Sequence, residues 1–497
     1  MFDLLIRGGN ILQSAHHASL VRADILVRDG VIVAIGTDLP QPADVMELDG
    51  DIVIPGLINA HLHSPGNFMR GTLENLPLEV FMLYEVPPLA DGTEDPETVR
   101  LRTQIGAAEM LKLGITTLMD DAFFVPLTSR SSIDAIAGAY ADIGIRATVA
   151  LDQPIVPEYE KYPFLRDLLP TQIVERMYTS PRESAEGMLA HYDHLISRWH
   201  GAADGRIAAA VSCSAPQRAT PAYLQALHGL AVRHDLPYFC HMLETKVQRV
   251  LGEEKYGQSL IQYADSLGIL DEHMQVIHAI WVDQADIAAL ARSGVVVAHN
   301  PVCNLRLGSG VMPFRQLRDA GVPICLGTDE AVSDDSHNLW GAIKTAAVVH
   351  AASGSDYRTW PTAAEILETV WDGGNRVMRR DRPLGRIEVG AHADFAVLDG
   401  KADTFRPLHD IRRALVFSES GRSVRHTVVA GRVVVRNGEL TTIDEAALLA
   451  ALRELEPALR QDAMALRESA AALEPFYRQM VQMAAERDVG ISRWVGS

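Results

Sequence analysis

Short apolar segments separated by turn residues form a similar pattern near both ends of the chain. Near the start, residues 23–27 and 31–35 flank Asp29-Gly30, an arrangement that predicts a β-hairpin. A comparable alternation returns late in the chain, at residues 393–398 and 433–438. We therefore predict one small β-sandwich built from both chain ends, residues 1–57 and 381–441.

Between these ends, strand-like apolar segments alternate with amphipathic helical segments, which is the pattern of a parallel sheet. The clearest strand-like segments are residues 115–119, 207–211, 237–240, 274–277, 295–298 and 323–327. The region 58–380 has room for eight βα units with insertions, so we predict an α/β fold with a TIM (β/α)8 barrel. A doubly wound sheet is the alternative, but no Gly-x-Gly-x-x-Gly motif follows an early strand, which weakens it.

The last segment, residues 442–497, is rich in Ala, Leu, Glu and Arg. Pro457 and Pro475 interrupt it, so the pattern predicts two or three helices. We interpret this C-terminal helical extension as an element for packing or for contact with another subunit.

The composition narrows the class of protein. The 497-residue chain has a formal net charge of −19, which argues against binding to nucleic acid because phosphate binding needs a basic patch. No signal peptide is recognised, and no uncharged apolar stretch approaches the ~18 residues of a membrane span. The widely spaced cysteines lie in or near apolar segments, as expected of buried free thiols: Cys213, Cys240, Cys303 and Cys325. These features predict a soluble, cytoplasmic protein.

Side chains that can bind a metal follow several of the predicted strands. His61 and His63 are two residues apart, so a strand would point both imidazoles to the same side. Later strands end in His241, His278, His299 and Asp329, and Glu244 follows three residues after His241. In a TIM barrel the C-terminal ends of the strands meet at one face, where the chemistry takes place. Three imidazoles and one carboxylate there would form a site for Zn²⁺ or Fe²⁺.

The motifs around these residues are specific when taken together. They are residues 55–63 (PGLINAHLH), 241–244 (HMLE), 276–278 (VIH), Asn304 with 307–310 (LGSG), 327–329 (GTD) and 385–394 (GRIEVGAHAD). In this combination the chain resembles the amidohydrolase superfamily, in particular its branch of cytosine deaminases and triazine hydrolases. The segment 385–394 is similar to the return of that family into its β-sandwich.

The resemblance implies one divalent metal per chain, Zn²⁺ or alternatively Fe²⁺, held by His61, His63, His241 and Asp329. Binuclear relatives need a bridging carboxylated lysine or a carboxylate from a middle strand. No lysine occurs between Lys161 and Lys246, so a single metal is the better interpretation.

The resemblance also implies catalytic roles. Glu244 is at the position of the proton shuttle, which would protonate a ring nitrogen and later the leaving group. His278 would orient the water and polarise the substrate from beyond the metal ligands. Asp329 would serve in catalysis as well as in metal binding.

Candidate substrate-binding residues are less well defined. Arg70 resembles a position that lines the pocket in several relatives, although it could equally pair with a neighbouring carboxylate. Gln217 and Asn304 could bind the edge of a heterocycle through their amides. Glu330 replaces the small residue common after the metal-binding Asp and could receive an amino group, although a carboxylate at a helix N-terminus explains it as well. Ser333 is at a pocket-adjacent position of triazine hydrolases and does not settle the leaving group.

These features predict a metal-dependent aminohydrolase that deaminates an amino-substituted nitrogen heterocycle of the pyrimidine, purine or s-triazine type. An alternative enzyme of the same family would displace chloride or an alkylamine from a ring, or cleave an exocyclic amide or urea bond. A non-catalytic scaffold is a remote alternative, since such proteins typically lose metal ligands. The expected partners are a small heterocyclic substrate and further copies of the chain in a homo-oligomer.

Overall fold

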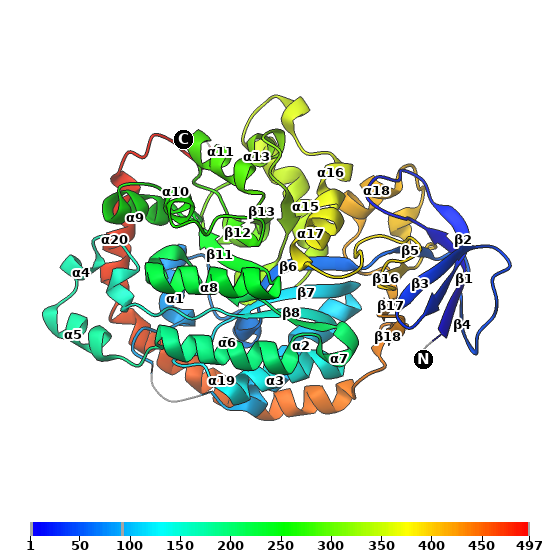
Figure 1. Cartoon of the computed structure of the whole chain (residues 1–497), viewed down its shortest axis with the longest axis horizontal. Helices are drawn as coiled ribbons and strands as arrows, with labels where there is room; N and C mark the ends of the chain where they lie inside the picture. The colour runs from blue at the N-terminus through cyan, green and yellow to red at the C-terminus, as the bar shows by residue number, and fades with distance from the viewer. Residues whose placement is uncertain (1–2, 91–93, 496–497) are drawn as a thin grey trace.

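The computed structural model describes residues 3–90 and 94–495 (Figure 1). Its strands are β1 (Asp3–Ile11), β2 (Val21–Arg28), β3 (Val31–Gly36), β4 (Asp44–Glu47), β5 (Ile52–Pro55), β6 (Leu57–His63), β7 (Ile115–Ala122), β8 (Arg146–Leu151), β9 (Ile207–Ala209), β10 (Val211–Ser212), β11 (Tyr238–Met242), β12 (Met274–His278), β13 (Val296–His299), β14 (Ile324–Leu326), β15 (Asp329–Glu330), β16 (Phe395–Leu398), β17 (Val424–Val429), β18 (Arg432–Arg436) and β19 (Glu439–Leu440).

The α-helices are α1 (Leu78–Glu85), α2 (Pro96–Lys112), α3 (Arg130–Ile143), α4 (Leu165–Leu168), α5 (Thr171–Thr179), α6 (Ala185–Trp199), α7 (Ala202–Gly205), α8 (Pro221–His234), α9 (Lys246–Tyr256), α10 (Leu260–Ser266), α11 (Gln284–Ser293), α12 (Pro301–Arg306), α13 (Phe314–Asp319), α14 (Ala331–Asp334), α15 (Leu339–Val348), α16 (Ala363–Glu368), α17 (Gly374–Met378), α18 (Ile411–Arg413), α19 (Glu445–Ala471) and α20 (Glu474–Glu486).

Both chain ends contribute to one sheet, which has nine strands within the described residues. β16 pairs antiparallel with β5 and thereby joins the late strands β16–β19 to the early strands β1–β5. The predicted hairpin is confirmed: β2 and β3 are antiparallel, and Asp29 and Gly30 between them have φ of 46° and 76°. Positive φ at both positions suits the right-handed twist of a hairpin. The apolar face of this sheet has its own buried cluster, with side chains from both ends of the chain.

The middle of the chain forms two parallel sheets whose strands alternate with helices, so the predicted α/β class with parallel pairing is confirmed. One sheet has the order β15-β6-β7-β8-β9 and the other the order β10-β11-β12-β13-β14. Residues 207–212 supply β9 to the first sheet and β10 to the second. Residues 324–330 likewise supply β14 and β15 to different sheets. The strands β6, β11, β12 and β15 therefore all belong to these two parallel sheets. At or near their C-terminal ends they carry His63, His241, His278 and Asp329-Glu330.

A buried ion pair joins this parallel region to the nine-stranded sheet. Arg146 of β8 donates from Nε to Asp394 Oδ2 at 2.8 Å and from Nη2 to Asp394 Oδ1 at 3.3 Å. The side chains are only 1% and 3% exposed, and Asp394 also accepts the backbone N–H of Ala430. Such a pair is costly to break because the remaining charge stays buried.

The C-terminal segment forms the helices α19 and α20, coloured orange and red in Figure 1. The expectation that Pro457 interrupts the segment is wrong, because α19 continues through it. A proline deletes a single N–H donor, and Pro457 lies at an exposed position of a long helix that also packs against α2. Pro475 occupies the first turn of α20, where a missing N–H does no harm. α20 packs against α1, α4 and α9.

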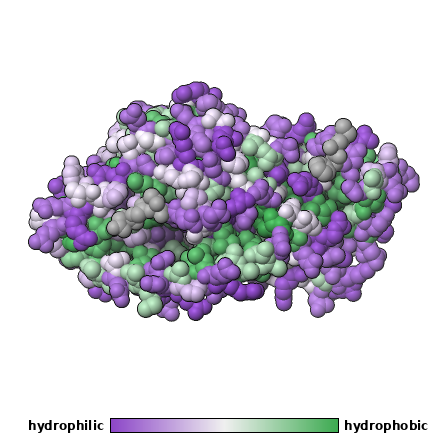
Figure 2. All heavy atoms as spheres, turned by 90° about the horizontal axis from the view of Figure 1, so that it is seen from below, coloured by the Kyte–Doolittle hydropathy of each residue, from purple (hydrophilic) through white to green (hydrophobic). Residues whose placement is uncertain are grey.

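The four cysteines are buried and free, as predicted. Within the described ranges, no helix combines the length and the apolar character that crossing a membrane requires. The face shown in Figure 2 has a band of hydrophobic side chains between largely hydrophilic margins.

Candidate active site

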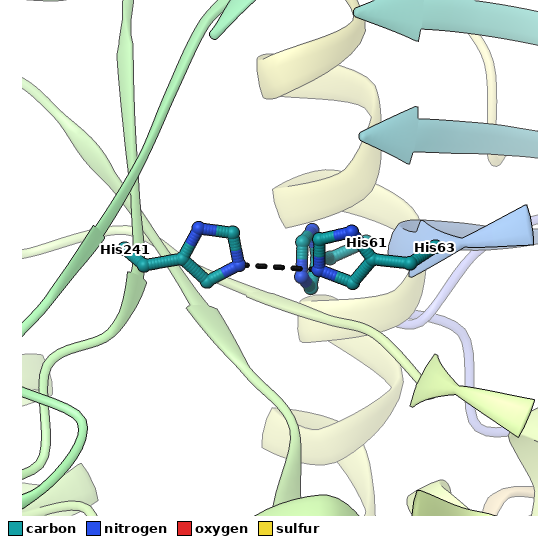
Figure 3. Close-up of side chains that lie close together, drawn as sticks. All are labelled: His61, His63 and His241. Carbon is teal, nitrogen blue, oxygen red and sulfur yellow. Dashed lines mark hydrogen bonds between the residues drawn. The ribbon is translucent and has the colours of Figure 1, made fainter. Parts of the chain in front are cut away.

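Three histidines point their Nε2 atoms at one another between the parallel strands (Figure 3). His63 Nδ1 donates to the carbonyl oxygen of Asp121 at 2.5 Å, and His241 Nδ1 donates to that of Ser214 at 2.7 Å. A carbonyl oxygen only accepts, so both Nδ1 atoms hold the proton and both Nε2 atoms present a lone pair. These two Nε2 atoms are 3.2 Å apart. Two buried acceptors at this distance are stabilised by a cation between them.

His61 and Asp329, two further predicted metal ligands, lie beside this pair. His61 Nε2 is buried and has no hydrogen-bond partner. It lies 3.6 Å from Asp329 Oδ1, and His63 Nε2 lies 3.7 Å from the same oxygen. Burial lowers the pKa of His61 and, together with the neighbouring imidazoles, lowers that of His241 well below the usual range, so both rings are neutral ligands. Three neutral imidazoles and a carboxylate fit a divalent transition metal.

The backbone at the strand ends is strained in a way that marks this region. Ser214, Leu243, His278 and Asp329 all have positive φ, between 54° and 74°. Non-glycine residues in this conformation cost about 1–3 kcal/mol each and gather at functional sites. Here the positive φ angles turn the backbone at the ends of β10, β11, β12 and β15, next to the cavity.

Glu244 and His278 form an acid–imidazole pair beside the ligands. Glu244 Oε2 lies 3.4 Å from His278 Nε2, and the Ser309 hydroxyl donates to Glu244 Oε1 at 3.4 Å. Burial, then the charges of Asp329 and Glu79, raise the pKa of Glu244 well above its usual value, which favours the protonated carboxyl. Burial lowers the pKa of His278 to about 4.

The amide of Asn304 fixes the tautomer of His278. Its Oδ1 accepts a hydrogen bond from His278 Nδ1 at 2.9 Å, which leaves Nε2 as the acceptor that faces Glu244. Asn304 was predicted to bind substrate, but it contacts His278 and does not line the cavity next to the ligands. It is a positioning group for the imidazole.

One cavity opens onto the ligand set. Its walls include apolar side chains of α1 and of the segments around Phe123 and Leu307. His63, His241, His278 and Asp329 all line it, and so does Glu244. These five predicted site residues therefore face one cavity.

Only one of the other predicted substrate-binding residues lines the cavity. Glu330 lines the cavity. Arg70 does not: its guanidinium pairs with Glu109, the alternative that the sequence left open. Gln217 is buried in the turn 216–218 but is not among the residues that line the cavity, whereas its neighbour Arg218 is. Neighbouring residues of this short helical turn face different sides, and substrate binding by Gln217 stays a prediction.

Other lining residues were not predicted from the sequence. Glu85 at the end of α1 and Asp152 after β8 line the cavity, as do Glu158, Lys161 and Tyr162. Asp152 does follow an apolar strand and lies within metal-ligand spacing of His63 and Asp121, a strand-end signal that the sequence interpretation passed over. His299 did end a predicted strand, yet it packs against His350 and Phe314 and does not line the cavity.

Imidazoles and a carboxylate at the ends of parallel strands, with a buried glutamic acid in the same cavity, are the arrangement of a metal-dependent hydrolase. Comparison with known proteins identifies the family within this class. The model of the amidohydrolase family matches residues 52–434, and the chain belongs to that family. It is accordingly a hydrolase that acts on carbon–nitrogen bonds.

Several characterised proteins are similar over most of their length. A 5-methylthioadenosine/S-adenosylhomocysteine deaminase of Thermococcus kodakarensis is 30% identical over 437 residues, which cover 87% of this chain and 94% of that protein. The structure of an adenosine deaminase from Xanthomonas campestris with bound zinc has 29% identity and a TM-score of 0.81, covering 93% and 99% of the two chains. An atrazine chlorohydrolase of Arthrobacter aurescens TC1, also solved with zinc, has 27% identity and a TM-score of 0.81, covering 91% and 99%.

Proposed function

We propose that the protein deaminates an amino-substituted nitrogen heterocycle by hydrolysis, with purine nucleosides as the first candidates. The observation on which this proposal depends is Glu244, a buried acid that lines the same cavity as the proposed metal ligands and whose raised pKa favours its protonated form. Ammonia is a poor leaving group until it is protonated, so C–N cleavage needs such an acid. The names of the similar deaminases support the choice of an amino group on a purine.

We further propose that His61, His63, His241 and Asp329 hold one zinc ion per chain. When bound, a divalent metal would activate water as a nucleophile and polarise the ring carbon under attack. The unpartnered His61 Nε2 and the facing lone pairs of His63 and His241 support this assignment. The zinc in two similar solved structures supports zinc over iron.

The side chains of this protein would perform the proton transfers. Glu244 would deliver the proton on its carboxyl group to a ring nitrogen, which makes the adjacent amino-bearing carbon more electrophilic. It would then take one proton from the attacking water and pass it to the departing nitrogen, and the remaining hydroxyl proton would return to Glu244 as the ring carbonyl forms. His278 Nε2, fixed as an acceptor by Asn304, would orient that water and hold the Glu244 carboxyl in place. The apolar wall that includes Phe81 and Phe123 would pack on the flat heterocycle and exclude bulk water.

We also infer that the two parallel sheets close into one (β/α)8 barrel over residues 58–380. Residues 207–212 and 324–330 connect the two sheets at both edges. One buried cluster includes side chains from around this ring: Ile58, Met119, Ala150, Ala210, Phe239, Ile277, Val296 and Cys325. The nine-stranded sheet then corresponds to a composite domain of residues 1–57 and 381–441, and residues 442–497 to a helical extension.

The test is ammonia release from a panel of purine nucleosides, aminopyrimidines and amino-s-triazines by the zinc-loaded protein. We expect ammonia from at least one amino heterocycle, with one oxygen atom of solvent water in the product. Release of chloride, an alkylamine or a cleaved urea in place of ammonia would support the alternative reactions of this family and reject the proposal.

A further inference from the structure

Two glutamates of the cavity, Glu85 and Glu330, have no role in the chemistry described above. Glu85 ends α1 and Glu330 follows the ligand Asp329 on β15, and both line the cavity. They are only 5% and 7% exposed, and the two carboxyl groups lie against each other. Gly66 lies beside them: a Cβ there would be 3.3 Å from Glu85 Oε1 and 3.7 Å from the Cβ of Glu330. The pair is thus held between α1, β15 and the turn that contains Gly66.

The oxygen atoms of this pair lack donors. Both oxygens of Glu85 and Oε2 of Glu330 are buried and receive no hydrogen bond from a donor of the protein. A buried carboxylate without a donor is costly: burial raises the pKa of Glu85 to about 7 and that of Glu330 well above its usual value, and a ligand that supplies N–H groups would satisfy both carboxylates. Because three acceptors lie together, a group with several N–H donors suits the site better than a single hydroxyl.

The charges that surround the cavity favour a cation. Among the described residues that line it, six are acidic (Glu85, Asp152, Glu158, Glu244, Asp329 and Glu330) and two are Lys161 and Arg218. Lys161 is already paired with Glu158. Apart from Glu244, whose raised pKa favours its protonated form, the acidic residues still outnumber the two basic ones, so the cavity favours a positively charged occupant.

A second metal ion is a poorer occupant than an organic cation. Glu330 lies near enough to His63 and Asp329 to form a group with metal-ligand spacing, but Glu85 belongs to no such group among the described residues. A metal bound there would leave both oxygens of Glu85 without a partner. An amidinium or guanidinium group has parallel N–H donors that can reach both carboxylates.

We propose that Glu85 and Glu330 bind a positively charged amino, amidino or guanidino group of the substrate, other than the amino group that is removed. The proposal rests on the proposed function and narrows its substrate class to heterocycles that bear a second, cationic nitrogen group. Charge-assisted hydrogen bonds to a buried carboxylate pair would strengthen binding of such a group by a factor of roughly 10 to 100 over a neutral analogue of the same shape.

The experiment compares benzamidine, which is cationic at neutral pH, with benzamide, its neutral counterpart of nearly the same shape. Binding of each to the zinc-loaded protein is measured by calorimetry in the parent, in Glu85→Gln and in Glu330→Gln. Glu186→Gln is the matched control, since Glu186 is an exposed carboxylate on α6. We expect a preference for benzamidine of about tenfold or more in the parent and in Glu186→Gln. Both cavity variants should lose this preference and keep the metal content of the parent.

Three results would overturn the proposal: equal binding of the two probes by the parent, an unchanged preference in Glu85→Gln, or a second tightly bound metal that Glu85→Gln removes. Glu85→Gln is informative even if Glu330→Gln disturbs the adjacent ligand Asp329. Because the experiment measures binding and not turnover, its result does not depend on whether the protein is a deaminase. A preference for benzamidine without ammonia release from any heterocycle would reject deamination and leave the cation site standing.

Discussion

Replacing Glu244 with Gln removes the acidic proton but keeps the size of the side chain and one oxygen atom. The Ser309 hydroxyl can still donate to that oxygen, and the surrounding packing is unchanged. What is lost is the group that gives a proton to the ring and to the departing nitrogen. We expect kcat to fall by a factor of roughly 10² to 10⁴, the usual contribution of a general acid–base group. At 1.36 kcal/mol for each factor of ten, this corresponds to about 2.7–5.4 kcal/mol of transition-state stabilisation.

The structure also predicts what the variant keeps. Glu244 contacts His278 and Ser309 and is not part of the groups with metal-ligand spacing, so the metal content should equal that of the parent. Glu79→Gln is a matched control, because Glu79 is also a buried carboxyl group near Glu244, is bound to the hydroxyl of Thr245, and does not line the cavity. Its kcat should stay within about tenfold of the parent, well short of the loss expected for an acid–base group.

The assay measures kcat and kcat/KM for ammonia release, elemental metal content and thermal unfolding of each variant. The reasoning is refuted if Glu244→Gln retains parental turnover, since the proton would then come from elsewhere. Loss of the metal in Glu244→Gln would make this residue a ligand. An equal loss of activity in Glu79→Gln would mean that any change in the buried carboxyl groups disturbs the site.

Three further predictions concern the metal content, the buried ion pair between Arg146 and Asp394, and the stability at low pH. Elemental analysis should find close to one zinc or iron per chain; two tightly bound ions would contradict the single site. Asp394→Asn should lower the free energy of unfolding by about 3–5 kcal/mol, because Arg146 stays buried without its counter-charge; equal denaturation curves would show that the pair contributes nothing. Burial, then the charge of Arg70, lowers the pKa of His337 to about 3, whereas an unfolded histidine has a pKa of about 6.5. As the pH falls from 6.5 toward 3 the unfolded chain takes up a proton that the folded chain refuses, so up to about 5 kcal/mol of stability is lost. Denaturation at several pH values should show a flatter pH dependence in His337→Gln, and parallel curves would contradict this origin.

The convergence of the four predicted metal ligands could be anticipated from the sequence because these residues follow a simple rule. His61, His63, His241 and Asp329 each follow or end an apolar strand, and the ends of parallel strands lie together. Glu244 is three residues beyond His241 and therefore stays near the same strand end. The catalytic and ligand roles of these residues remain predictions, but their convergence is a feature of the structure.

The walls of the cavity were not predictable in the same way. Glu85 comes from a helix outside the strands, and its meeting with Glu330 depends on how α1 packs over the strand ends. Arg70 had two possible partners of equal merit, and only the tertiary packing placed Glu109 beside it. Pro457 shows the limit of local rules, since a long helix that packs against α2 tolerated a residue that usually ends a helix.

The central claim is that the protein removes an amino group with the help of an acid, and a matched pair of substrates tests it most directly. The pair consists of the best amino heterocycle of the ammonia-release panel and its counterpart with chlorine at the same ring carbon, so that the two differ in the leaving group alone. Chloride leaves without protonation, so an enzyme that uses Glu244 as its acid should gain its advantage on the amino compound. We predict a higher kcat/KM for the amino compound, with one ammonia released per turnover and a loss of that advantage in Glu244→Gln. A higher kcat/KM for the chloro compound would contradict the assignment as a deaminase while leaving the fold and the metal ligands in place.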